Sequence, residues 1–204
     1  MKSEPLRRLP HPSMEALARC SLVLLIAELV LILLSWILSA TMTEGVRSLL
    51  SGEGMRWFFG RSAQMIASPL LAWLLLLLIA GGCLVRSGLL SRRQGYRDRI
   101  ALRLSLAFLL AYVAFLLALT AMPHALLLSA TGSLFPSAFS AGLVPAVAFG
   151  LVLVSVAYGA VSGRFRSLAD VLDSLSFGIR RGAPLFFVYI LLIQFYESLR
   201  FVFG

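Results

Sequence analysis

An acidic side chain lies within the first long apolar run of the chain. Glu28 is preceded by the sequence LVLLIA and followed by LVLILL. An ionisable group inside a membrane-spanning helix is costly, and it usually faces a cavity, a partner or the interior of a bundle. No lysine or arginine lies within the next three apolar runs to pair with it. Two roles for Glu28 therefore stay open: it carries a coupling proton, or it is a protonated structural acid at a contact between helices.

A second group of polar residues lies near the end of the last apolar run. Gln194, Glu197 and Arg200 follow one another at i, i+3 and i+6, which places them along one ridge of a helix. Glu197 and Arg200 are close enough on that ridge to form an ion pair. The spacing is more typical of a span end whose charges neutralise each other than of a functional polar site.

The stretch VRSLLSGEGMRWFFG, residues 46–60, joins the first two apolar runs and contains two glycines around a glutamate. A phosphate-binding loop would need more glycines, a Lys-Ser or Lys-Thr end and a preceding strand, and none of these is present. Ser51 is instead suited to cap a short helical turn. Arg56, Trp57, Phe58 and Phe59 then predict an anchor at the depth of the lipid headgroups.

Small residues recur at four-residue spacing in the fourth apolar run, at Ser155, Gly159 and Gly163. Such spacing allows two helices to approach closely. It predicts a packing contact, either within the chain or between protomers.

Residues for catalysis or metal binding do not form any recognisable pattern. His11 and His124 each lack a cysteine, a carboxylate or a second histidine at ligand spacing. No serine, histidine and acid arrangement and no pair of catalytic carboxylates can be argued. The sequence predicts that the protein is not an enzyme and that it binds no metal or cofactor.

The composition indicates which kind of secondary structure holds these residues in place. Of the 204 residues, 60% are hydrophobic and only 13% are charged, and the mean hydropathy is +0.94. Apolar runs of about 17–25 residues have the length of a helix that crosses a bilayer. We expect a single all-α membrane domain over residues 1–204, with a basic tail at 1–20. The predicted spans are 21–40, 69–85, 104–122, 141–161 and 184–203.

The chain carries a net charge of +9, and its basic residues are unevenly distributed. Fourteen of the 18 lysines and arginines fall in the N-terminal tail and in the connections after the second and fourth spans. This bias predicts a cytoplasmic N-terminus and a C-terminus outside. Contact with anionic lipid explains the arginines better than binding to nucleic acid does.

A second interfacial helix is predicted at residues 167–179, in addition to the one at 46–60. Its leucines, valine and isoleucine follow helical spacing, and Asp170 and Asp173 face away from that stripe. Ser167 and Asp170 resemble a capping box with aspartate in place of glutamate. Such a helix lies on the bilayer surface or packs against the bundle.

Two segments, which together cover about two thirds of the chain, resemble the p-aminobenzoyl-glutamate transporter (AbgT) family. The first is residues 20–90, with VRSLLSGEGMRW followed by a span that ends in GCLVRSGLL. The second is residues 131–196, with SLFPSAFSAGLVP, then YGAVSGRFRSLADV and a closing QF. Members of that family are longer, with nine spans and two re-entrant hairpins. The hairpin regions, which carry the substrate-facing residues in the family, have no counterpart in this sequence.

The resemblance implies a transporter-like protein for folate-related compounds in the bacterial cytoplasmic (inner) membrane, driven by an ion or proton gradient. Because the hairpins are missing, no substrate-contact residue is carried over, and the matching parts correspond to scaffold. The alternative is a non-transporting scaffold that forms a homo-oligomer or binds a larger membrane partner. The lipid bilayer is the partner that both interpretations share.

Overall fold

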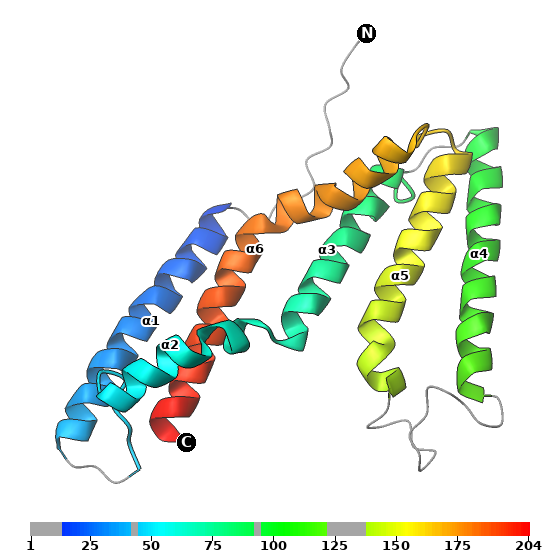
Figure 1. Ribbon diagram of the computed structural model, residues 1–204. Coiled ribbons are helices and arrows are strands. Elements are labelled where there is room, and N and C mark those ends of the chain that lie inside the picture. The colour runs from blue at the N-terminus through cyan, green and yellow to red at the C-terminus, as the bar shows by residue number, and fades with distance from the viewer. Residues whose placement is uncertain (1–13, 42–44, 92–94, 122–137) are drawn as a thin grey trace. The chain divides into compact units, whose positions relative to one another are not determined.

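The computed structural model describes residues 14–41, 45–91, 95–121 and 138–204. Within these ranges the chain forms helices and no strands (Figure 1). Their bounds are α1 Met14–Ala40, α2 Gly52–Ile66, α3 Pro69–Ser87, α4 Tyr96–Ala121, α5 Ala138–Val161 and α6 Leu168–Phe203. The predicted all-α class is therefore confirmed. The expectations for His11, His124 and most of the basic tail lie outside the described residues.

Five of the helical segments in the described part of the chain are long and apolar enough to cross a membrane. They are Met14–Ala40, Gly52–Ser87, Tyr96–Leu119, Gly142–Val161 and Leu168–Phe203. The prediction of an all-α membrane protein agrees with this count. The helices extend beyond several predicted spans, because the first turns of α1 and α4 are polar but keep helical backbone. At 1.5 Å per residue, a helix of 27 residues is about 40 Å long, which exceeds the hydrocarbon thickness of about 30 Å.

The sequence correctly places the start of α3 but misjudges the last part of the chain. Pro69 occupies the first position of α3, where its missing N–H costs nothing. Residues 167–179 and 184–203, predicted as an interfacial helix and a separate span, form the single 36-residue helix α6. Pro184 lies inside α6 and does not start it. A proline removes one hydrogen bond of a helix, and long apolar helices packed against neighbours tolerate that loss.

Two compact units make up the chain, and each has its own internal packing. Unit 1 comprises Met1–Leu71 and Ala183–Gly204, and unit 2 comprises Ala72–Gly182. The unit boundaries pass through two helices, near the start of α3 and in the middle of α6, next to Pro184. The first and last parts of the chain therefore belong to the same unit.

Unit 1 packs α1, the connection at residues 45–51 and α2 around the C-terminal part of α6. Its buried core consists of Leu31, Leu49, Phe201 and Val202. The connection is held from both sides, because the N–H of Leu49 donates to Ser35 Oγ at 3.2 Å and the N–H of Arg47 donates to the carbonyl of Val202 at 3.0 Å.

The break between α2 and α3 is closed by a side chain of α6 in the same unit. The hydroxyl of Tyr189 lies 2.9 Å from the carbonyl oxygen of Ile66 and 2.7 Å from Ser68 Oγ. A carbonyl at the end of a helix has no partner within that helix. The carbonyl of Ile66 accepts from the N–H of Ser68 at 2.8 Å and also from the hydroxyl of Tyr189, which therefore ties this turn to α6.

Unit 2 contains two helix contacts of different kinds. The helices α4 and α5 lie side by side (Figure 1). Tyr112 of α4 lies against Gly150 and donates to the carbonyl of Ala146 at 2.9 Å. The other contact joins α3 to the first half of α6 through glycines. A Cβ atom built at Gly82 would overlap the backbone of Gly178, and one built at Gly178 would overlap the carbonyl of Leu78.

Candidate functional site

The glycine-containing connection between α1 and α2 is built for packing. Ser51 caps α2, since its hydroxyl accepts a hydrogen bond from the N–H of Gly54 at 3.0 Å. Gly54 is buried, and a Cβ atom there would lie 2.6 Å from the carbonyl oxygen of Ser48 and even closer to that of Leu49. The glycine therefore allows the start of α2 to close onto the preceding turn. The predicted cap is confirmed.

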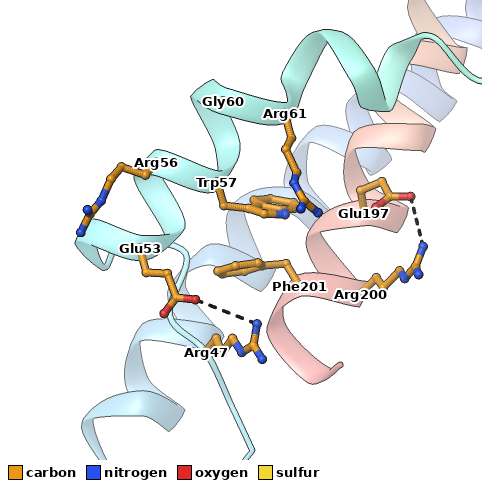
Figure 2. A pocket seen from close by; sticks show the side chains of 9 residues that line it. All are labelled: Arg47, Glu53, Arg56, Trp57, Gly60, Arg61, Glu197, Arg200 and Phe201. Atoms are coloured by element: carbon orange, nitrogen blue, oxygen red, sulfur yellow. Dashed lines mark ion pairs between the residues drawn. The ribbon is translucent and has the colours of Figure 1, made fainter.

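An open pocket of about 790 Å³ lies beside this connection in unit 1 (Figure 2). The side chains that form it come from the connection itself, from one face of α2 and from the last turns of α6. Its lining residues are Arg47, Glu53, Arg56, Trp57, Gly60, Arg61, Glu197, Arg200 and Phe201. Two regions that are far apart in the sequence, residues 47–61 and 197–201, therefore contribute to one site.

Two stacked aromatic rings form the apolar part of the pocket. The ring centroids of Trp57 and Phe201 lie 4.4 Å apart, and the ring planes differ by 27°. The guanidinium carbon of Arg47 lies 5.9 Å from the centroid of Phe201. Figure 2 shows these rings between the charged side chains of α2 and those of α6. The pair offers an aromatic surface for a flat group of a ligand.

Positive charge prevails in the same pocket. Four arginines and two glutamates line it, which gives a net charge of +2. The two ion pairs are long: the closest nitrogen–oxygen distance is 4.0 Å both between Arg47 and Glu53 and between Arg200 and Glu197. Exposed ion pairs of this kind contribute about 0–1 kcal/mol, so an incoming anion can replace either glutamate. Guanidinium groups also match the bidentate geometry of a carboxylate or phosphate.

The four residues of the predicted anchor, 56–59, lie on two different faces of α2. Arg56 and Trp57 line the large pocket, and Arg56 Nε also donates to the carbonyl of Gly52 at 3.0 Å. Phe58 and Phe59 instead line a smaller, almost wholly apolar pocket of about 190 Å³. Consecutive residues of a helix point about 100° apart, so four in a row cannot share one face.

Glu28 lies at the edge of this smaller pocket and contacts α6. The hydroxyl of Ser198 donates to Glu28 Oε1 at 2.7 Å, and Gln194 Nε2 donates to Ser198 Oγ at 3.2 Å. Glu28 Oε2 is buried, and no hydrogen bond from the described residues reaches it. The expected contact between helices is present. Ser198 was not among the residues predicted for this site, although it lies one turn after Gln194 on the same face of the helix.

The three residues of the predicted ridge, Gln194, Glu197 and Arg200, therefore lie in two different sites. Gln194 belongs to the hydrogen-bonded group around Glu28, whereas Glu197 and Arg200 line the arginine pocket. A step of three residues turns a helix by about 300°, so residues at i and i+6 drift apart around the axis. The predicted pairing of Glu197 with Arg200 is present, at the long distance given above.

The small residues of the fourth span have separate local roles. Ser155 is fully buried in α5. A Cβ atom at Gly159 would overlap the ring of Phe165, which folds back after the helix. Gly163 lies beyond the end of α5 with a φ of +77°, a left-handed conformation that ends helices and suits glycine. Gly163 is therefore part of a turn, and the three residues do not form the single helix-packing face that the spacing predicts.

Unit 2 contains a second set of small residues that was not predicted from the sequence. Ser174, Gly178 and Gly182 repeat every fourth residue on α6, and the last two contact Leu78 of α3. Ser174 Oγ lies 3.5 Å from the sulfur of the buried Cys83. This is the close helix approach typical of small residues at four-residue spacing. Ser174 and Gly178 lie in the helix predicted at 167–179, which was expected on the bilayer surface or against the bundle, and Gly182 lies between that helix and the predicted span 184–203.

Comparisons of the chain with protein-family models, curated proteins and solved structures found no match. The resemblance to p-aminobenzoyl-glutamate transporters stays a prediction from the sequence. The site is therefore interpreted from its own geometry and charge.

Proposed function

We propose that the protein is a membrane transporter-like protein whose arginine pocket admits amphipathic aromatic amides that carry carboxylates, such as p-aminobenzoyl-glutamate and related folate-like compounds. The observation that carries this proposal is the combination of four arginines with the stacked rings of Trp57 and Phe201 in one open pocket. An aromatic amide with acidic groups presents a flat ring and negative charge together. Each of these properties has a matching surface in the pocket.

The size and openness of the pocket support this class of ligand. Pockets for small molecules commonly have volumes of about 300–1,000 Å³, and the present one has about 790 Å³. Arg61 of α2 extends toward the rings, and Arg200 lies on α6 on the other side of the pocket (Figure 2). A carboxylate between the two helices would be reached by guanidinium groups from both sides.

The position of Glu28 in the same unit supports transport that is driven by a proton gradient. Its carboxyl group accepts a hydrogen bond from Ser198 inside an otherwise apolar part of α1. An ionisable group in such a position is a natural place for a coupling proton. In this proposal the protein resides in a bacterial inner membrane with its N-terminus in the cytoplasm, and the arginine pocket opens on the outer side.

The test is uptake of labelled p-aminobenzoyl-glutamate by proteoliposomes, with and without a pH gradient. We expect gradient-dependent movement that Glu28→Gln abolishes. We also expect Arg61→Gln and Arg200→Gln each to weaken binding about tenfold, because each removes a charged hydrogen-bond donor. Arg19→Gln is the matched control, since Arg19 pairs with Glu15 on α1 away from the pocket. Movement equal to that of empty liposomes, or full coupling in the Glu28 variant, would contradict the proposal.

A scaffold without transport activity is the second candidate, and the exposure of α1 favours it. Only Ser21, Leu31 and Ser35 of this 27-residue helix are buried. The remaining apolar surface suits either lipid or another helix, which leaves room for a homo-oligomer or a larger membrane partner. Cross-linking in native membranes tests this candidate. A chain that stays monomeric while it moves the labelled amide excludes it.

A further inference from the structure

A cluster of arginines surrounds one aromatic ring and one carboxylate in unit 2, separate from the arginine pocket. Arg86 at the end of α3 and Arg180 on α6 both bind the carboxylate of Asp173, one turn before Phe177. The guanidinium carbons of Arg86 and Arg181 lie 5.3 Å and 5.9 Å from the ring centroid of Phe177. Two guanidinium groups thus share one carboxylate, and a third lies near the ring of Phe177. These four charged residues carry three positive charges and one negative charge.

The arginines of this cluster remain accessible. The side chains of Arg86 and Arg180 are 39% and 62% exposed, although both bind Asp173. A guanidinium group has five N–H donors, and an ion pair with one carboxylate leaves several of them for a further acceptor. The remaining donors can therefore bind an additional anion, which shares the guanidinium groups with Asp173.

The position of the cluster along both helices corresponds to the edge of an apolar layer. Arg86 directly follows the apolar residues 69–85 of α3, and Arg181 is the last charged residue before the apolar residues 183–193 of α6. Nearer the start of α6, Leu168 and Leu172 are 89% and 66% exposed. Arginines at the end of an apolar run, on a helix with exposed leucines, are typical of the headgroup level.

We propose that Arg86, Arg180 and Arg181, which contact Asp173 or Phe177, bind the phosphate of an anionic phospholipid such as phosphatidylglycerol. The phosphate lies against the guanidinium groups, and the acyl chains lie along the apolar residues of α3 that precede Arg86. Asp173 holds two of the arginines in place and competes with the phosphate for them. This inference does not depend on the proposed transport function.

Native mass spectrometry of the full chain, with phosphatidylglycerol or phosphatidylcholine added, tests the proposal. We expect the wild type to bind phosphatidylglycerol preferentially. The double variant Arg86→Gln/Arg180→Gln should lose about 25-fold in affinity for it, at about fivefold for each basic residue near an anionic surface. The matched control is Arg99→Gln, an exposed arginine at the start of α4 that is not one of the three arginines of the cluster, and it should lose much less affinity than the double variant.

A second variant separates lipid binding from folding. Asp173→Asn keeps all three arginines and removes their competitor, so its affinity for phosphatidylglycerol should rise about fivefold. Circular dichroism establishes that each variant keeps its helix content. The proposal is overturned if the folded double variant keeps its lipid preference, if Arg99→Gln loses as much, or if Asp173→Asn binds no more tightly than the wild type. Equal competition by inorganic phosphate at lipid concentrations would overturn the assignment to a lipid.

Discussion

The two units join their helices by different means, and this difference explains where the pockets described above lie. In unit 2, α3 and α6 meet through the backbones of Gly82 and Gly178, which leaves no room for side chains between them. In unit 1, the C-terminal part of α6 meets α1 and α2 through side chains, including Ser198 and the stacked Trp57 and Phe201. Helices kept apart by side chains leave space for a ligand, whereas helices in backbone contact do not.

Gly178→Ala should have the largest effect, because it adds a methyl group where a helix backbone already lies. The new Cβ atom would overlap the carbonyl of Leu78, and the backbone cannot move aside as a flexible side chain can. We expect a loss of about 3 kcal/mol in the free energy of unfolding, measured by thermal melting in detergent.

Gly81→Ala is the matched control for this variant. A Cβ atom at Gly81 meets no atom within 4 Å. Alanine is the better helix former by about 1 kcal/mol, so the control should be neutral or more stable. Equal destabilisation by both substitutions would show that the glycine crossing is not the cause.

Ser198→Ala should have an intermediate effect in unit 1. It removes the donor to Glu28 and the acceptor of Gln194 in one step. A buried polar group that loses its partner costs about 1–3 kcal/mol, so we expect a loss of about 2 kcal/mol. Ser62→Ala on the exposed side of α2 should change stability by less than about 0.5 kcal/mol.

A double variant sharpens this second prediction. If Ser198 acts through Glu28, then Ser198→Ala should cost less in a Glu28→Leu background than in the wild type. Additive losses in the double variant would mean that the two side chains do not interact energetically.

Glu53→Gln should have the smallest effect on stability and a clear effect on ligand binding. Its ion pair with Arg47 is long and exposed, so the free energy of unfolding should change by less than about 1 kcal/mol. Loss of the carboxylate frees Arg47 for an anionic ligand, and affinity measured by calorimetry should rise up to about fivefold. Glu15→Gln, which breaks a more exposed pair with Arg19 outside the pocket, should leave the affinity unchanged.

The fold class could be predicted from the sequence because each apolar run is long enough to cross a bilayer on its own. Local signals were equally reliable: Ser51 caps α2, and Ser167 and Asp170 form the expected capping box. The continuity of α6 could not be predicted, because Gly182 and Pro184 are typical of a break and only the surrounding structure shows that the helix continues.

The candidate site was harder to predict because its residues come from distant segments. Arg56 and Trp57 were identified as a lipid anchor, and Arg200 as part of a neutralised span end. Nothing in the local sequence indicates that these residues line one pocket. Gly178 and Gly182 carried a recognisable packing signal, but its meaning depended on knowing that the residues lie on α6 opposite α3.

The hydrogen bonds of Tyr189 have a consequence for the order in which the protein is made. Tyr189 is 121 residues from Ser68 and 123 residues from Ile66, and both of its partners are synthesised first. The turn between α2 and α3 therefore emerges from the ribosome long before the Tyr189 hydroxyl that forms hydrogen bonds with it. Unit 1 as a whole also needs the segment Ala183–Gly204, which is synthesised after unit 2. During biogenesis, unit 2 can therefore assemble before the C-terminal part of α6 is available to complete unit 1.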